Sequence, residues 1–208
     1  MGKPGAVTVL LLLLTMECAA QNMALPPTPV RSQSISVMGG WSWPLSHDGF
    51  TQYWGPGPAA SLEFLKGVSR TVSLGFDLEG AAYWFRGPEF AAANPGVPFK
   101  NPPIAQIAAG VVGRFTIAPG KKLTPYFSGM IGLSHVTGAE YRQDTDSGRV
   151  TYYYIPIQTR LAVSLRGGLE YRISRSIAFD AEASALYVHH DPDVGITTVA
   201  RGGFRFIF

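Results

Sequence analysis

The sequence predicts an all-β protein, an eight-stranded antiparallel up-and-down transmembrane β-barrel. Eight segments within residues 32–208 alternate apolar and polar side chains with a period of two, which is the period of a β-strand. The large aromatic residues of the apolar face gather near the ends of these segments, and the polar face carries arginines and acids in equal number. No stretch after residue 20 reaches the roughly 20 consecutive apolar residues that a membrane-spanning helix needs. A membrane-spanning chain of this kind must therefore close its backbone hydrogen bonds as a barrel.

Residues 1–20 have the pattern of a secretory signal peptide. Lys3 supplies a positive charge, residues 7–14 form a short apolar run, and Cys18, Ala19 and Ala20 precede a plausible cleavage point. A lipoprotein anchored at Cys18 is the less favoured alternative, because Met16 and Glu17 stand where small residues are expected. Ordinary cleavage removes the single cysteine, so the mature chain is expected to form no disulfide. Proline-rich residues 21–31 then form a periplasmic lead-in to the barrel of residues 32–208.

The first four predicted strands cover residues 32–43, 58–66, 71–85 and 104–117, and each has one apolar face. These faces consist of Ile35, Val37, Trp41 and Trp43; Ala60, Leu62 and Phe64; Leu74, Phe76, Leu78 and Trp84; and Ile107, Val111 and Phe115. Small or charged residues occupy the positions between them. Each segment therefore has the pattern of a strand whose two faces lie in different environments, one apolar and one polar.

The last four predicted strands cover residues 124–136, 157–173, 177–188 and 196–208. Their apolar faces consist of Phe127, Ile131 and Leu133; Leu161, Val163, Leu165 and Tyr171; Phe179, Ala181, Ala183 and Tyr187; and Ala200, Phe204, Phe206 and Phe208. Short turns near residues 67–69, 119–121 and 174–176 alternate with longer connections at 44–57, 86–103, 137–156 and 189–195. Short turns at one rim and long loops at the other are typical of outer-membrane barrels, whose short turns face the periplasm.

Aromatic residues indicate that the apolar face meets lipid. Phe64, Phe115, Phe127, Tyr171 and Phe179 lie near the short-turn rim, whereas Trp41, Trp43, Trp84 and Tyr187 lie near the long-loop rim. Two aromatic girdles around an aliphatic band are the arrangement that a bilayer favours. A soluble eight-stranded barrel with the reverse orientation is the alternative, and it gives no reason for this sorting.

The polar face is predicted to fill the lumen with ion pairs, because the interior of an eight-stranded barrel is just filled by side chains. Buried charges must pair. The predicted network consists of the acids Glu63, Asp77, Glu79, Glu170, Asp180 and Glu182 and the bases Arg114, Arg160, Arg166, Arg172, Arg201 and Arg205. A narrow or gated pore through this lumen is a second alternative.

The signal peptide, the eight strands and the terminal run Phe204-Arg205-Phe206-Ile207-Phe208 together resemble the OmpA/OmpX type of small outer-membrane β-barrel proteins. The resemblance implies location in the cell outer membrane of a Gram-negative bacterium, with lipid and lipopolysaccharide around the barrel. It also implies that Phe204, Phe206 and Phe208 form the assembly signal read by the barrel-assembly machinery. Basic residues are spread singly along the chain, so nucleic acid is not an expected partner.

Three further patterns suggest chemistry. His189, His190, Asp191 and Asp193 could contribute to a metal site, and residues 144–148 contain part of a calcium-loop pattern. Both patterns are incomplete, so no metal and no cofactor are predicted. His135, Thr137 and Glu140 loosely resemble the residues of outer-membrane lipid A deacylases, with threonine in place of serine. A lipid-A-modifying hydrolase is therefore the alternative to the favoured structural or surface-interaction role without catalysis.

Aromatic residues in the long connections leave the role of the loops open. They are Phe50, Tyr53, Trp54, Phe90, Phe99, Tyr141 and Tyr152, Tyr153 and Tyr154. As exposed side chains they would bind an extracellular ligand or surface. As extensions of the strands they would instead lie at the level of the lipid headgroups.

Overall fold

The computed structural model describes residues 32–45, 51, 53–93, 95, 104–137, 139–144, 150–155, 158–189 and 194–208. The predicted signal peptide and lead-in lie outside these residues. Eight long strands form the barrel: β1 (Gln33–Pro44), β3 (Gly57–Gly67), β4 (Val72–Phe85), β5 (Ile104–Thr116), β6 (Leu123–Val136), β9 (Gln158–Arg172), β10 (Ile177–His189) and β11 (Val194–Ile207). The eight predicted strands are therefore confirmed, with ends shifted by a few residues.

The barrel is closed and every strand pairs with its neighbours in antiparallel fashion. Around the ring the order is β4, β3, β1, β11, β10, β9, β6 and β5, and β5 pairs with β4 to complete it. Strands β1 and β11 meet at the seam between the start and the end of the barrel, where Ile35 is opposite Phe206 and Val37 is opposite Phe204. Closure leaves no unpaired edge among the eight strands, which is the condition for crossing lipid.

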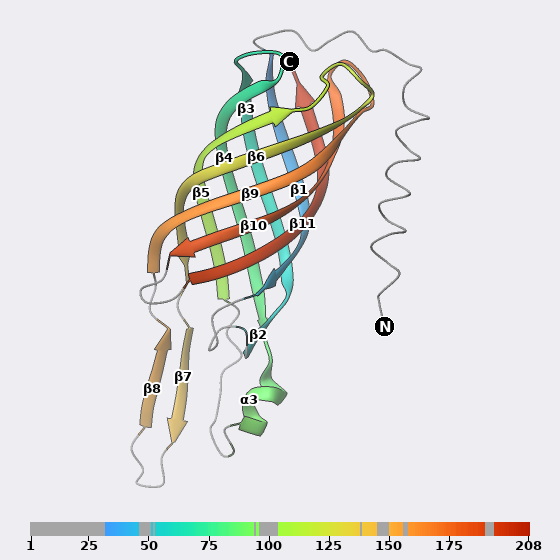
Figure 1. Ribbon diagram of the computed structural model, residues 1–208. Coiled ribbons are helices and arrows are strands. Elements are labelled where there is room, and N and C mark those ends of the chain that lie inside the picture. Colours follow the sequence, from blue (N-terminus) through green and yellow to red (C-terminus); the bar gives the residue numbers. More distant parts are fainter. Residues whose placement is uncertain are drawn as a thin grey trace, which may run out of the picture.

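The two rims of the barrel differ (Figure 1). The turn rim carries the short connections 68–71, 117–122 and 173–176 and the carboxyl terminus. The opposite loop rim carries β2 (Trp54–Gly55), the short helix α3 (Gly87–Ala93) and a hairpin of β7 (Ala139–Asp144) and β8 (Val150–Ile155) that extends away from the barrel. The sequence pattern predicted these connections only as loops. The fourth predicted long loop is wrong in length, because β10 continues to His189 and β11 begins at Val194, and only residues 190–193 remain between them.

The turn at residues 117–122 contains the two positive φ angles of the described backbone, 50° at Ala118 and 96° at Gly120. Glycine adopts this left-handed conformation without steric cost, whereas alanine does so at some cost in free energy. Ile117 and Thr116 are held at the start of the turn by backbone hydrogen bonds to Pro125 and Thr71.

The apolar face predicted to meet lipid is the outer face of the barrel. Leu165 and Phe76 are among its most exposed members, at 68% and 66% of their full surface. The adjacent residues Arg166 and Asp77 are buried inside, so each strand alternates between the two environments as predicted. A soluble barrel would bury the apolar face instead. No helix among the described residues is long and apolar enough to span a membrane.

Three kinds of side chain fill the interior. A charged cluster lies on the turn-rim side, and a cluster of apolar residues borders it. The apolar cluster consists of Leu65, Ala108, Val112, Met130, Ala162, Leu186 and Val188. A third cluster, mostly aromatic, closes the loop rim and is built from Trp54, Tyr83, Phe85, Phe90 and Ile104. The core of this small barrel is thus its lumen, and the charged cluster is its largest polar part.

Candidate functional site

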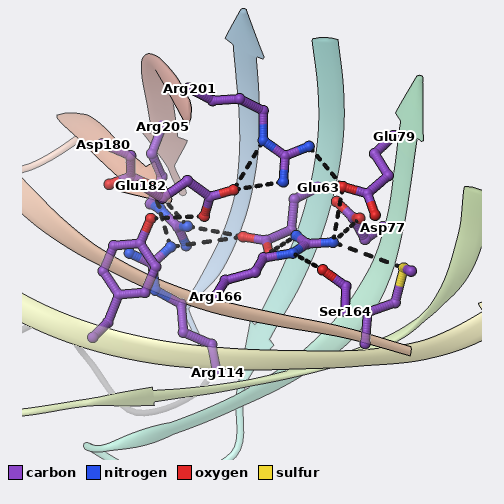
Figure 2. A network of polar contacts seen from close by, with 12 residues as sticks. Glu63, Asp77, Glu79, Arg114, Ser164, Arg166, Asp180, Glu182, Arg201 and Arg205 are labelled. Atoms are coloured by element: carbon purple, nitrogen blue, oxygen red, sulfur yellow. Dashed lines mark hydrogen bonds and ion pairs between the residues drawn. The ribbon is translucent and has the colours of Figure 1, made fainter. Parts of the chain in front are cut away.

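Eleven of the twelve predicted lumen charges are buried in one connected cluster. Its acids are Glu63, Asp77, Glu79, Glu170, Asp180 and Glu182, and its bases are Arg114, Arg166, Arg172, Arg201 and Arg205. They come from β3, β4, β5, β9, β10 and β11, all at inward positions of the alternation. Figure 2 shows the central members converging from opposite walls of the barrel.

Arg166 on β9 makes the longest reach across the lumen. Its Nη2 is in direct contact with Oδ2 of Asp77 on β4, three strands away around the ring. Its Nη1 lies 3.6 Å from Oε2 of Glu63 on β3, and β3 is separated from β9 by four strand steps in either direction. Nε of Arg166 also donates to the hydroxyl of Ser164 at 3.2 Å. Arg166 therefore ties together opposite walls of the barrel.

Two further arginines from β11 cross the seam between the first and last strands. Nη2 of Arg205 lies 2.9 Å from both Glu63 on β3 and Asp180 on β10. Arg201 lies 2.8 Å from Glu79 on β4 and 2.7 Å from Glu182 on β10. These contacts hold β11 to strands on both sides of it, in addition to the backbone ladder.

Arg114 on β5 joins the cluster from the remaining side of the ring. Its Nη1 lies 3.1 Å from Asp180, and its guanidinium carbon lies 3.4 Å from the centre of the Tyr126 ring. The hydroxyl of Tyr126 donates to Glu182 at 3.0 Å. The ring face of tyrosine attracts a cation, so Tyr126 serves as a neutral bridge between a base and an acid.

The cluster holds one more acid than base. Five arginines face six carboxylates, a formal balance of 5 − 6 = −1. Removing one partner of a buried ion pair leaves an uncompensated charge, which costs roughly 3–5 kcal/mol, whereas the intact pair adds little net stability. The cluster therefore acts mainly as a specific connection between walls.

Arg160 is a correction to the predicted network. It lies near the loop-rim start of β9, opposite Ser134 of β6, and its side chain is exposed. Among the described residues it makes none of the ion pairs of the cluster. The alternation assigns Arg160 to the inward face, but it carries no information on height along the barrel, and Arg160 lies only two residues from the loop-rim start of β9.

The loop rim is closed by an aromatic cap, defined as Trp54, Tyr83, Phe85 and Phe90. Trp54 of β2 pairs with Phe85 of β4 in the backbone register, and Phe90 of α3 packs on the Phe85 ring with 5.4 Å between centres. Trp54 and Phe90 are only 1% and 3% exposed. The sequence left them open as exposed binding residues or as strand extensions at headgroup level, and the structure instead buries both in the mouth of the barrel.

Tyr83 anchors this cap to the barrel wall. Its hydroxyl donates to Oε1 of Gln106 at 2.9 Å and lies 3.1 Å from the Ser42 hydroxyl. Tyr83 and Phe85 occupy inward positions of their strand, so the alternation contained a signal for the cap. The contribution of Trp54 and Phe90 had no such signal, because both lie in connections.

Little free space separates the cap from the charged cluster. A cavity of about 10 Å³ lies between Tyr83, Gln106, Leu186 and Arg201. One water molecule needs roughly 10–15 Å³ of such space. The geometry favours a plugged lumen over the narrow pore that the sequence left as an alternative.

His135 and Thr137, two residues of the alternative hydrolase pattern, each have a hydrogen-bond partner outside that pattern. Nδ1 of His135 lies 2.9 Å from the hydroxyl of Thr159 on the neighbouring strand. The hydroxyl of Thr137 instead accepts from the backbone N–H of Ala105 at 2.9 Å and lies 3.2 Å from the Ala105 carbonyl. Thr137 is thus a backbone-capping residue. The side chain of Glu140 lies outside the described residues.

The two metal patterns fall mostly outside the described residues. His189 ends β10 with an exposed side chain, and residues 190–193 are not described; the same holds for residues 145–149 after Asp144. Within the described ranges, no group of three or more His, Cys, Asp or Glu residues is placed to hold a metal ion.

The carboxyl-terminal residue closes the barrel seam. The backbone N–H of Phe208 donates to Gln33 at 2.9 Å, and the Gln33 N–H donates back to Phe208 at 2.9 Å. The Phe208 ring itself is 65% exposed. Phe204 packs edge to face on Phe179, with 5.7 Å between ring centres, so the terminal aromatics continue the girdle of the turn rim.

No family model and no curated protein matches the sequence, but solved structures match the fold. Neisserial surface protein A aligns with a TM-score of 0.56 and 13% identity, covering 85% of this chain and 97% of its own. OprG of Pseudomonas aeruginosa gives 0.53 and 10% identity, covering 88% and 99%. The chain has the fold of the small outer-membrane β-barrels. The predicted resemblance is therefore confirmed at the level of the fold.

A third outer-membrane barrel with this fold is Ail, the attachment invasion locus protein of Yersinia pestis. It aligns with a TM-score of 0.50 and 15% identity over 86% of this chain and all of its own, and it was solved in complex with the heparin analogue sucrose octasulfate. At these identities the likeness concerns the barrel and carries no residue of one protein's binding site over to the other.

Proposed function

We propose that this barrel is a surface-interaction protein of the outer membrane, which anchors the β7–β8 hairpin outside the cell for contact with a protein partner. The predicted signal peptide and the turn-rim position of the carboxyl terminus support an orientation with the turn rim in the periplasm. The outer face then contacts membrane lipid, with lipopolysaccharide in the outer leaflet. The terminal strand is the part that the assembly machinery would recognise.

The observation that carries the proposal is a contrast between the two parts of the molecule. Among the described residues, an aromatic cap, an apolar cluster and a charged cluster occupy the lumen, which favours an anchor over a conduit. The hairpin extends beyond the loop rim (Figure 1), where six consecutive residue pairs link β7 to β8. A closed barrel that presents a paired hairpin beyond its rim suits recognition better than conduction.

The sequence of the hairpin indicates the class of partner. Tyr141 pairs with Tyr153, Arg142 with Tyr152 and Glu140 with Tyr154. Tyrosine is enriched in protein-binding surfaces, because it offers a large amphipathic contact area at low entropic cost. Residues 137–156 contain two bases and three acids, so their formal charge is 2 − 3 = −1. This charge does not favour a polyanion such as the ligand in the Ail complex.

No catalytic step is part of the proposal. The hydroxyl of Thr137 is engaged by the Ala105 backbone, and His135 contacts Thr159 instead. The carboxylates of the charged cluster are tied to arginines, so the cluster is better suited to structure than to acid–base chemistry.

The test compares outer-membrane vesicles that carry the full chain with vesicles in which residues 139–155 are replaced by a short glycine-serine linker. Both are applied to arrays of purified immobilised proteins and of glycans. We expect selective binding to proteins that falls at least tenfold without the hairpin, while heat-modifiable migration shows that both barrels are folded. Tyr153→Phe keeps the aromatic ring and serves as the control. Tyr153→Ser removes the ring and serves as the disruptive variant. Equal binding with and without the hairpin, or selective binding to glycans alone, would contradict the proposal.

A further inference from the structure

The turn end of the lumen contains a polar cavity that borders the charged cluster. Its volume is about 60 Å³, which exceeds the roughly 10–15 Å³ needed for one water molecule. Four arginines line it, namely Arg70, Arg114, Arg172 and Arg205, together with one carboxylate, Glu170. Serine and threonine residues, including Ser34 and Ser73, complete much of the polar wall. We refer to this space as the turn-rim cavity.

Arg172 has donor capacity that the described residues do not use. Its side chain is 9% exposed, and its ion pair joins Nη2 to Oε1 of Glu170 at 3.2 Å. Its Nη1 makes no hydrogen bond or ion pair within the described part of the chain, and Arg172 lines the cavity. A guanidinium N–H is a strong donor that is normally satisfied, so this unused donor favours an acceptor in the cavity.

The charge of the lining selects the kind of acceptor. Four arginines against one glutamate give a formal lining charge of 4 − 1 = +3. Arg114 and Arg205 share this charge with Asp180 and Glu63 deeper in the cluster, whereas Arg70 is exposed at the mouth and makes no ion pair within the described part of the chain. Arg172 and Arg70 thus form the less compensated side of the cavity. A planar guanidinium favours an oxyanion with several oxygens.

We propose that the turn-rim cavity binds a phosphate group. A tetrahedral group of five non-hydrogen atoms suits a cavity of this volume and a wall of guanidinium and hydroxyl donors. The same chemistry has two sources on this side of the membrane: free inorganic phosphate, and the headgroup of a phospholipid in the adjoining leaflet. The aromatic girdle of the turn rim places the cavity mouth close to that leaflet.

The experiment uses the full barrel refolded in a maltoside detergent that contains no phosphate. Sodium phosphate and short-chain phosphatidylglycerol are titrated separately by calorimetry, with chloride holding the ionic strength constant. Arg172→Gln removes the underused guanidinium, and Ser73→Leu fills the cavity without removing an ion pair. Arg175→Gln is the matched control, because Arg175 is exposed in a turn of the same rim and does not line the cavity.

We expect saturable binding to the wild type and to Arg175→Gln with affinities within twofold of one another. Arg172→Gln should weaken binding at least tenfold, and Ser73→Leu should abolish it. If inorganic phosphate gives this pattern, the free ion is sufficient for binding. If only the lipid gives it, the ligand is the phospholipid headgroup. Absence of saturable binding of either probe to the wild type overturns the proposal. Equal binding to the wild type and to Ser73→Leu also overturns the proposal. This comparison remains decisive if Arg172→Gln fails to fold.

Discussion

Arg166 and Asp77 form a buried ion pair between β9 and β4, two strands that are not neighbours in the barrel. The backbone ladder connects each strand only to the strands beside it. This side-chain contact, with its extension to Glu63, instead connects walls across the lumen. The cross-section of the barrel is therefore fixed by side chains as well as by hydrogen bonds around the ring.

The excess of one acid in the cluster predicts an unequal response to mutation. Arg166→Met leaves six acids facing four arginines, and we expect a loss of roughly 3–5 kcal/mol in the free energy of unfolding. Asp77→Asn leaves five of each and should cost clearly less. Urea unfolding in lipid vesicles, followed by tryptophan fluorescence, measures both values.

Arg160→Met provides the control on the same strand. Its side chain is exposed and outside the cluster, so the expected change is within about 0.5 kcal/mol. Equal losses for Arg166→Met and Arg160→Met would show that the buried cluster does not constrain the barrel.

The outer face predicts that a charge introduced in the middle of a strand strongly lowers the stability of the inserted barrel. Leu165 lies in the middle of β9 and is 68% exposed to the membrane side. Leu165→Arg should destabilise the inserted barrel by about 2–4 kcal/mol, whereas Leu165→Ala should cost much less because the side chain is not packed in a core. Insertion into vesicles, measured by heat-modifiable migration, compares the two. Similar yields from both variants would mean that this face does not meet the hydrocarbon.

The alternation of the sequence was sufficient to predict the barrel because each strand has two different environments. It placed Leu165 outside and Arg166 inside, and the two girdles fixed the orientation of the faces. The period of two does not encode position along the barrel axis. For that reason Arg160 was predicted inside the network, although it is exposed near the loop-rim start of β9.

The closure of the loop rim depends on residues in connections that the alternation does not describe. Trp54 and Phe90 lie in connections without periodicity, and both pack against Phe85. The β7–β8 hairpin was likewise predicted only as part of a long connection. The ion-pair partners, such as Arg166 with Asp77, required the register of every intervening strand.

The carboxyl terminus combines a structural role with the predicted assembly role. Deletion of Phe208 removes two backbone hydrogen bonds to Gln33 at the seam and the terminal ring. Phe208→Ala removes the ring and keeps the backbone bonds. We expect the deletion to block assembly in cells and the substitution to reduce it severalfold, as measured by the folded fraction in outer-membrane preparations. Normal assembly of the deletion variant would contradict an assembly signal in this strand.

The contacts of His135 predict that it has no part in lipid A chemistry. His135→Ala removes one hydrogen bond to Thr159 on the outer face of the barrel, near the loop rim. Mass spectrometry of lipid A from cells that produce the wild type or this variant should give the same number of acyl chains. A change in acyl-chain number that requires His135 would instead favour the hydrolase.

Cysteine labelling in intact cells tests the orientation on which the proposed surface role depends. Thr151→Cys places a thiol in β8 of the hairpin, and Ser174→Cys places one in a turn of the opposite rim. The parent chain is the control, since its single cysteine, Cys18, is expected to leave with the signal peptide. A membrane-impermeant maleimide should label Thr151→Cys in intact cells, and Ser174→Cys only after the outer membrane is permeabilised. Labelling of Ser174→Cys but not Thr151→Cys in intact cells would contradict the account.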